Sequence, residues 1–365
     1  MTGLHDVRAR TLAARAALGL RRRLLALADA VVPPQLALFE RGMGVAQTQL
    51  LRAAVRLGVA DRLKEGPRSA GDLARACGVS EDALFRALRA LAALGVFELG
   101  ADGRFANNRL SLALCADALG SVADFLVYLG SRANALAWGD LERTLADGAS
   151  AFERVHGESV WAWVRRHPEE ERAFAAAMVH ITELDAPEIA AGYPFGELRR
   201  VCDVAGGHGT LLAEVLRRHR ELEGVLLDAP QVVAEAPGFL AARGVAGRTR
   251  CVGGDFFEEV PADCDAYLLK DVLHDWDDEA CLRILRTCRR AARTGARVVV
   301  AELLLERLDA SSPAAVSDVH MMVVCHGGRQ RSAAEHQALL AAAGFRAGRV
   351  LHLRAPLGLV EGIAA

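Results

Sequence analysis

The second half of the sequence alternates short apolar runs with longer amphipathic segments, and this alternation constrains the fold more than any other feature. The apolar runs are Arg200–Ala205, Gly224–Asp228, Thr249–Gly253, Ala266–Lys270 and Arg297–Ala301. Helical patterns separate most of them, at 209–219, 230–242, 277–293 and 332–343. Buried parallel strands read as continuous apolar runs, and alternating strands and helices favour a sheet covered on both faces. The sequence therefore predicts an α/β fold with a doubly wound, Rossmann-like sheet from about Leu198, and 349–353 and 357–362 as closing strands.

The first 110 residues follow a different, mainly helical pattern. Residues 1–35 form an Ala- and Arg-rich helical pattern that a Pro-Pro pair ends. Beyond it, Ser69 and Ser80 stand where helix N-caps belong, and Ala101-Asp102-Gly103 is a turn signal between two short strands. Helices followed by a hairpin are the outline of a winged helix. The expected domains are an N-terminal arm with a winged helix at 1–109, a helical linker at 110–197, and the α/β domain at 198–365.

Composition excludes several classes of protein. Hydrophobic residues make up 52% and charged residues 25% of the 365, which is typical of a globular chain. The formal charge of −2 argues against a protein that mainly binds nucleic acid. No apolar run reaches the roughly 18 residues of a membrane helix, and the stretch 24–32 lacks a convincing signal-peptide cleavage site. None of the eight cysteines forms a C-x-x-C pair, which predicts no metal site and a reduced, cytoplasmic setting.

The strongest local motif is the run Asp203-Val204-Ala205-Gly206-Gly207-His208-Gly209, where a strand ends and a helix begins. Glycines let the backbone approach a ligand, and α/β sheets bind ligands at this end of their strands. A dinucleotide fingerprint would require Gly or Ala at position 212, which is Leu212. Asp203 instead suits a cofactor with a cationic amino group and a sulfonium. The residues expected to approach this cofactor are Gly206, Gly207 and Gly209.

Two further acids end the next two strands. Asp228 is placed to accept both hydroxyls of a ribose, and Asp255 is followed by Phe256, which is positioned to lie on an adenine face. Each has a structural alternative, since Asp228 could simply cap the helix that starts near Pro230. Their joint occurrence with Asp203 at three successive strand ends favours S-adenosylmethionine over NAD.

His274 lies in the loop after the fourth strand, next to the expected reactive end of the cofactor. Its unperturbed pKa of about 6.5 suits it to take a proton from a phenol-like hydroxyl while the oxygen attacks. Glu302 follows the next strand and could orient the imidazole by accepting from its other nitrogen. A lone histidine more often has a core or surface role, but a partner acid at the adjacent strand end favours catalysis.

Together with Gly327-Gly328-Arg329-Gln330-Arg331-Ser332, these motifs resemble the S-adenosylmethionine-dependent O-methyltransferases of the plant caffeate and bacterial hydroxyneurosporene type. The resemblance covers nearly the whole chain, since that family also has an N-terminal winged-helix dimerisation domain. It implies a homodimeric, metal-independent enzyme that methylates a hydroxyl, phenolic in the expected case, of a small natural product such as an aromatic polyketide.

The resemblance also implies roles for single residues. Lys270 matches a residue beside the cofactor, and Asp275 matches a position near the acceptor. The family holds the acceptor with its central helices and with the segment before the Gly-Gly turn, which makes pocket candidates of Trp138, Met178, His180, Met321, Met322 and His326. Their alternative is an ordinary place in the core. Gln330 departs from the family, which usually carries Glu there, and a neutral amide cannot stabilise an imidazolium by charge.

Two other functions stay open from the sequence. Some relatives keep the cofactor fold but hydroxylate or decarboxylate polyketides, and the cofactor motifs do not separate these cases from methyl transfer. The winged-helix outline suggests a DNA-binding regulator. However, residues 44–106 carry nine basic and seven acidic side chains, a net charge of only +2. The expected recognition helix also begins with Glu81 and Asp82, where phosphates would be met.

Overall fold

The computed structural model describes residues 2–308, 312–353 and 356–365, which divide into two compact units. The first unit consists of the start of the chain up to Arg21, Leu136–Arg166 and Thr182–Ala365, and the second of Arg22–Ala135 and His167–Ile181. Three helices belong partly to each unit: α1 (Thr2–Ala30), α8 (Arg132–Trp138) and α12 (Pro168–Gly192). The division into three domains stays a prediction.

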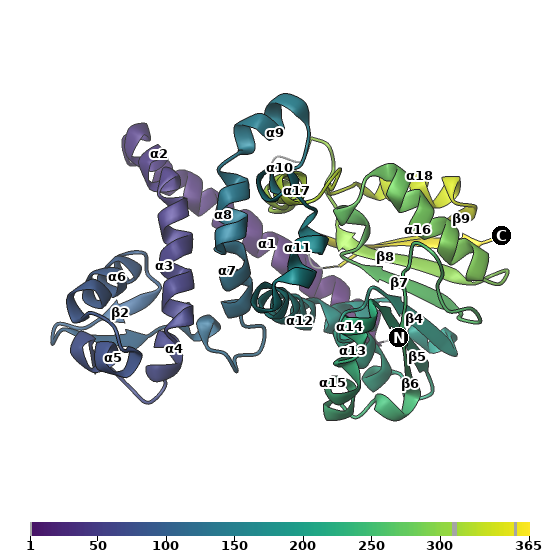
Figure 1. Ribbon diagram of the computed structural model, residues 1–365, viewed down its shortest axis with the longest axis horizontal. Coiled ribbons are helices and arrows are strands. Elements are labelled where there is room, and N and C mark those ends of the chain that lie inside the picture. The colour runs from purple at the N-terminus through teal and green to yellow at the C-terminus, as the bar shows by residue number, and fades with distance from the viewer. Residues whose placement is uncertain (1, 309–311, 354–355) are drawn as a thin grey trace. The chain divides into compact units, whose positions relative to one another are not determined.

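A seven-stranded mixed sheet forms the centre of the first unit, in the order β6-β5-β4-β7-β8-β10-β9 (Figure 1). The first five strands of this order are parallel, and β10 is antiparallel to both of its neighbours. This confirms the predicted α/β sheet. The strands are β4 (Arg200–Val204), β5 (Glu223–Asp228), β6 (Thr249–Gly253), β7 (Ala266–Lys270), β8 (Arg297–Leu303), β9 (Phe345–His352) and β10 (Leu357–Ala364).

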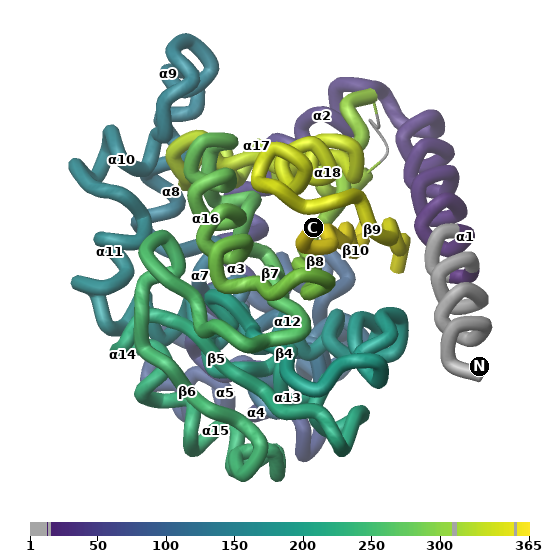
Figure 2. Tube along the Cα trace, turned by 90° about the vertical axis from the view of Figure 1, so that its right-hand side faces the viewer, coloured from purple at the N-terminus to yellow at the C-terminus, as the bar shows by residue number. Residues whose placement is uncertain are grey.

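Helices cover both faces of this sheet. Successive side chains of a strand point to opposite faces, so each strand contributes to two cores. Cys202 belongs to the core that α16 (Asp278–Ala291) and α18 (Ala333–Ala342) cover, whereas its neighbour Val201 belongs to the core under α13 (Thr210–Arg218). In Figure 2, α18 lies beside β9 and β10, which it contacts. The interior strands β4, β7, β8 and β10 are therefore buried on both faces, whereas the edge strands β6 and β9 are largely exposed or half-buried.

Two helical segments differ from the pattern in the sequence. The predicted helix at 230–242 is interrupted and forms α14 (Pro230–Val233) and α15 (Ala236–Ala242). Pro237 explains the break, because it has no N–H and its ring excludes the carbonyl of the residue four positions earlier. A further helix, α17 (Ala314–Val324), precedes the Gly-Gly turn and had not been predicted.

The second unit contains the expected winged helix. Its three-stranded sheet has the order β1-β3-β2, and Ser69 and Ser80 accept the N–H groups of Asp72 and Ala83 as N-caps. Leu73, Leu88 and Phe105 are among its fully buried residues. Its elements include α3 (Gly44–Arg56), α5 (Ala70–Cys77), α6 (Glu81–Ala93), β1 (Arg68–Ser69), β2 (Phe97–Leu99) and β3 (Arg104–Asn107).

Each of the remaining helices lies within one unit. In the second unit they are α2 (Pro34–Gly42), α4 (Val59–Arg62) and α7 (Ala123–Leu129). In the first unit they are α9 (Leu141–Asp147), α10 (Ala151–His156) and α11 (Val160–Arg166). No helix in the described parts of the chain is both long and apolar enough to cross a membrane.

Candidate active site

The loop after β4 forms a narrow cradle around the carboxyl group of Asp203. Asp203 is 1% exposed, and its Oδ2 has no hydrogen-bond partner among the described residues. Burial raises the pKa of this carboxyl to about 7. A Cβ on Gly206 would lie 2.6 Å from the Asp203 carboxyl group, so only glycine leaves this space open. Gly207 and Gly209 adopt left-handed backbone conformations, with φ of 59° and 84°, that glycine adopts without strain.

Asp228 connects the end of β5 to the same loop. Its Oδ2 accepts the N–H of Gly207 at 2.7 Å, and its Oδ1 accepts the N–H of Ala229 at 2.7 Å. Burial raises the pKa of Asp228, and these two amide donors oppose that shift. Each carboxylate oxygen keeps further acceptor capacity, so the side chain can also receive hydroxyl groups.

The segment after β6 carries an aromatic cluster. The ring of Phe256 is 4.8 Å from that of Phe257, and Phe257 meets Trp276 edge-on at 4.9 Å between centroids. Asp255 accepts the N–H of Phe257 at 2.8 Å, which fixes the turn. The structure thus places Asp255 and Phe256 beside the loop that holds Trp276.

Lys270, at the end of β7, is a buried cation between two carboxylates. Its Nζ contacts Asp271 and lies 3.6 Å from Oδ2 of Asp185 on α12. Burial lowers the pKa of Lys270, but the two acids outweigh burial and raise it overall. Asp271 has a φ of 53°, unusual for a residue with a side chain. No pattern in the sequence pointed to Asp185.

The imidazole of His274 has a neighbour at each nitrogen. Nδ1 lies 3.0 Å from Nε2 of Gln330, and Nε2 lies 3.5 Å from Oδ1 of Asp275. Burial lowers the pKa of His274, but Asp275 and Glu302 outweigh it and raise the pKa above 6.5. Burial raises the pKa of Asp275 to about 7, against the effect of His274. Gln330 therefore occupies one side of the ring and Asp275 the other.

Glu302 differs from the expected arrangement, because its carboxylate binds the backbone of the loop. Oε1 accepts the N–H groups of Val272, Leu273 and His274 at 3.2, 2.7 and 3.1 Å. Among the hydrogen bonds of the described chain, none joins Glu302 to the His274 ring, whose Nδ1 side is taken by Gln330. Three backbone N–H groups give the carboxylate more hydrogen bonds than one ring nitrogen could. Glu302 therefore fixes the backbone of residues 272–274 and orients His274 through it.

Two buried basic side chains support this loop, and the sequence gave no reason to single them out. His336 and Glu302 are both fully buried, with 3.3 Å between Nε2 and Oε2. Arg331 is 1% exposed and donates to the carbonyls of Leu273 and Trp276 at 2.8 Å each. The sequence pattern did not mark His336 or Arg331 as functional, because each contacts residues that are distant in the sequence and close only in the fold.

The acceptor candidates are distributed over both units. Trp138 donates through Nε1 to Nδ1 of His320 at 3.2 Å, and the two rings stack at an angle of 14°. Burial lowers the pKa of His320 to about 4, so this ring is neutral at physiological pH. The sequence did not single out His320; it lies one residue before the half-buried Met321 and Met322 on α17.

The other three acceptor candidates are His326 in the first unit and Met178 and His180 in the second. The side chain of His326 is 67% exposed, and its Nδ1 lies 3.5 Å from Glu153. Met178 and His180 belong to the second unit, where His180 lies 3.2 Å from Asp124. Within the described ranges, no group of three His, Cys, Asp or Glu side chains is arranged to hold a metal ion.

Two protein families match the chain. The O-methyltransferase domain family matches residues 138–346, and the O-methyltransferase dimerisation domain family matches residues 42–117. The chain is 38% identical over 320 residues to the mitomycin biosynthesis 6-O-methyltransferase of Streptomyces lavendulae, which covers 87% of this chain and 91% of that protein. It is 39% identical over 312 residues to the 3-amino-4-hydroxybenzoate 4-O-methyltransferase of Streptomyces cremeus, with 85% and 84% covered.

Solved structures give the same result. The crystal structure of LaPhzM superposes with a TM-score of 0.88 at 35% identity and covers 92% of this chain and 100% of that chain. The structure of NcsB1, an O-methyltransferase from neocarzinostatin biosynthesis in complex with S-adenosylmethionine and 2-hydroxy-5-methyl naphthoic acid, superposes with a TM-score of 0.75 at 32% identity, with 88% and 96% covered. The likeness thus includes both the sheet and the helical unit.

Proposed function

Because the chain belongs to the O-methyltransferase family with an N-terminal dimerisation domain, we propose that it methylates a hydroxyl group of a small natural product at the expense of S-adenosylmethionine. The observation that carries the proposal is the unpartnered, buried Oδ2 of Asp203 on the sheet edge from which the His274 loop also extends. A buried carboxylate without a partner is costly, and a cationic ligand would supply the missing donor.

The residues at this edge fit S-adenosylmethionine. Asp203 would accept from the ammonium group, and Gly206 leaves room for the approach. Asp228, held by two amides, would receive the ribose hydroxyls, while Asp255 and Phe256 would border the adenine. Lys270, which its acids keep charged and in place, would lie beside the cofactor. When bound, S-adenosylmethionine supplies the electrophilic methyl group on a sulfonium.

His274 is the proposed general base for the acceptor hydroxyl. Its Nε2 side faces Asp275, which would stabilise the imidazolium that proton uptake creates. For Nε2 to take the proton, Nδ1 must already carry a hydrogen. Oε1 of Gln330, unpartnered among the described residues, can accept this hydrogen after the amide rotates. Glu302 is a positioning residue that holds the loop.

The acceptor would lie against the end of α8 and against α17. Trp138, Met321 and Met322 are proposed contacts on the first unit, as are Asp275 and His326. Met178 and His180 stay predictions from the sequence. A phenolic hydroxyl suits the base, because the pKa of a phenol is about 10 and an imidazole can therefore help to remove its proton.

The dimerisation domain supports a homodimer, which a light-scattering mass of twice 39.0 kDa would verify.

Product mass tests this function. The purified chain, incubated with S-adenosylmethionine and a panel of phenolic acceptors, should add one methyl group per acceptor and release S-adenosylhomocysteine in equal amount. An Asp203→Asn variant should bind S-adenosylmethionine at least about tenfold more weakly in calorimetry. Products that have gained oxygen or lost carbon dioxide would instead identify the alternative function, hydroxylation or decarboxylation. The neutral Gln330, where the family usually has Glu, is the reason to test for it.

A further inference from the structure

Lys270, Asp271 and Asp185 form a charge cluster at the end of β7, and its two acids have no part in the function described above. The Lys270 ammonium contacts Asp271 and lies 3.6 Å from Oδ2 of Asp185. The three side chains are only 6%, 20% and 15% exposed, in the order of their naming. All three residues belong to the first unit, although Asp185 comes from α12 and not from the sheet. Two carboxylates thus surround one ammonium where there is little water.

The cluster lies on the same face and at the same edge of the sheet as Asp203. β7 pairs in parallel with β4, and Leu268 lies opposite Asp203 in this pairing. Residues two apart on a strand share a face. Asp203 follows Val201 and Lys270 follows Leu268 at this spacing, and both apolar residues belong to the core under α13. Burial raises the pKa of Asp203, and the charge of Lys270 is among the influences that oppose this rise.

The cluster also acts on His274, which lies in the turn after β7. Burial lowers the pKa of His274, and Asp271 is one of the acids that raise it, while Lys270 lowers it. The cluster is therefore within electrostatic reach of both Asp203, the proposed site of the cofactor's ammonium group, and the proposed base. The sulfur of a bound cofactor would lie between these two ends, because its methyl group has to reach the acceptor oxygen beside the base.

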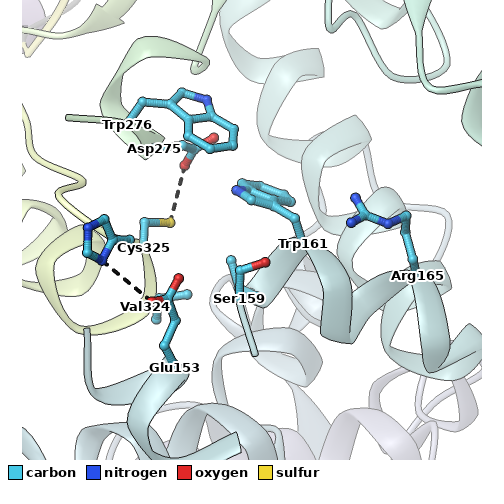
Figure 3. A pocket seen from close by; sticks show the side chains of 10 residues that line it. Glu153, Ser159, Trp161, Arg165, Asp275, Trp276, Val324 and Cys325 are labelled. Carbon is cyan, nitrogen blue, oxygen red and sulfur yellow. Dashed lines mark hydrogen bonds and ion pairs between the residues drawn. The ribbon is translucent and has the colours of Figure 1, made fainter. Parts of the chain in front are cut away.

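The cluster is separate from the cavity beside His274. That cavity measures about 170 Å³, and its lining includes Asp275 and Cys325, whose Sγ donates to Oδ1 of Asp275 at 3.6 Å (Figure 3). Neither Lys270 nor either acid of the cluster lines it. The charges of the cluster are thus placed to act on the cofactor and not on a ligand in this cavity.

The charge of the cofactor's sulfur changes during the proposed reaction. Methyl transfer breaks the bond between sulfur and the methyl carbon, leaves its electron pair on sulfur, and forms a bond from that carbon to the acceptor oxygen, whose proton goes to His274. The sulfonium thereby becomes a neutral thioether. A lysine alone would repel the sulfonium, since like charges in a poorly hydrated site repel strongly. Two carboxylates on that lysine reverse the sign of this interaction.

We propose that Asp271 and Asp185 make the cluster attract the sulfonium, and that these two acids discriminate S-adenosylmethionine from its product, S-adenosylhomocysteine. The proposed contacts of Asp203 and Asp228, with the ammonium group and the ribose, are the same for both molecules and cannot separate them. The inference rests on the proposed function, because that function places the sulfur between Asp203 and His274. It adds a binding preference that weakens once the methyl group has been transferred.

Calorimetry with S-adenosylmethionine and with S-adenosylhomocysteine tests this role. Asp271→Asn and Asp185→Asn each remove one charge at nearly constant size. Asn also tolerates the left-handed backbone at position 271, where φ is 53°. In each variant the Kd for S-adenosylmethionine should rise about tenfold relative to the Kd for S-adenosylhomocysteine. A unit charge close to a ligand has an effect of this size at an effective dielectric constant of about 20.

Matched variants separate an electrostatic role from a structural one. Asp185→Glu keeps the charge and should keep the wild-type ratio of the two Kd values within about twofold. Glu221→Gln removes the same charge from an exposed residue that precedes the first residue of β5, at the opposite edge of the sheet, and should also keep the ratio. Thermal unfolding without ligand shows whether each Asn variant is folded, and either folded variant decides the question.

The outcomes distinguish this inference from the function on which it rests. An unchanged ratio in a folded Asp271→Asn or Asp185→Asn variant, including an equal loss of affinity for both molecules, overturns the inference, because a structural role would affect both ligands alike. If the ratio changes as expected but the wild type methylates no hydroxylated acceptor, the proposed function is contradicted and the sulfonium preference stands.

Discussion

Oε1 of Glu302 accepts the backbone N–H of His274 at 3.1 Å, together with the two N–H groups before it. A single carboxylate thus holds three consecutive residues of the turn, while the imidazole is free to meet Gln330 and Asp275. Since the ring direction follows from the path of the turn, the geometry of the proposed base depends on a residue that does not touch the ring.

Replacing Glu302 by Gln should destabilise the protein by about 3 kcal/mol, because the change leaves three amides and buried His336 without their negative partner. Urea unfolding measures this loss, with exposed Glu259→Gln as the control. Burial raises the pKa of Glu302, but His336 and His274 outweigh it and lower it to about 2. This stabilisation is present above the ordinary value of 4.5 and is lost as the pH falls towards 2. A variant as stable as the wild type at pH 7 would contradict this role.

Replacing His274 by Ala should lower kcat by about 10²- to 10⁴-fold, which is the usual contribution of a general base. Since only the neutral imidazole accepts a proton, wild-type kcat/KM should rise with pH up to a pKa above 6.5, as the raised pKa of His274 requires. The His274→Ala profile should lack this limb. Methyl transfer at an unchanged rate in the variant would rule out the general base and leave alignment as the source of the rate.

Substitutions of Gln330 should move the acid limb of the pH profile in opposite directions. Gln330→Glu places a carboxylate near Nδ1 of His274, which stabilises the imidazolium and shifts the limb to higher pH. Gln330→Leu removes the hydrogen bond and should shift the limb to lower pH. Chemical shifts of the His274 ring measured against pH give the same pKa values without turnover. Coincident titrations of all three proteins would show that Gln330 does not act on the ring.

Adding a methyl group at position 206 should block the cofactor cradle. The Cβ of Gly206→Ala would lie 2.6 Å from both the Asp203 carboxyl and a methyl group of Leu226, so one of them must move. The dissociation constant for S-adenosylmethionine should rise at least about tenfold, which calorimetry measures. Gly247→Ala is the matched control, because its Cβ would meet nothing within 4 Å. Equal affinity in both variants would place the cofactor elsewhere.

The sheet was predictable because its information is local. Runs such as Thr249–Gly253 and Ala266–Lys270 have the bounds that the sequence predicted. The first four residues of Ala266–Lys270 are buried, as expected of a strand covered on both faces. Acids near the carboxyl ends of parallel strands lie along one edge of the sheet, which is why Asp228 reaches Gly207 in the loop that follows the strand of Asp203.

The details of the histidine loop were not predictable, because they depend on long-range contacts. Whether Glu302 meets a ring or a backbone depends on the path of residues 272–274, which Arg331 fixes from 58 residues away in the sequence. The contact of Trp138 with His320 joins positions 182 residues apart. The break before Pro237 was also missed, although its signal is local, because a proline at this position excludes a continuous helix.

The final strand, β10, is an interior strand: it lies between β8 and β9 and pairs with both. During synthesis, β8 therefore presents an unpaired edge until residues 357–364 have been made. Exposed edges pair readily with other chains, so the formation of β10 covers an edge of β8 that could otherwise pair with another chain. A tag or truncation at the C-terminus would thus affect the assembly of the whole sheet rather than only its margin.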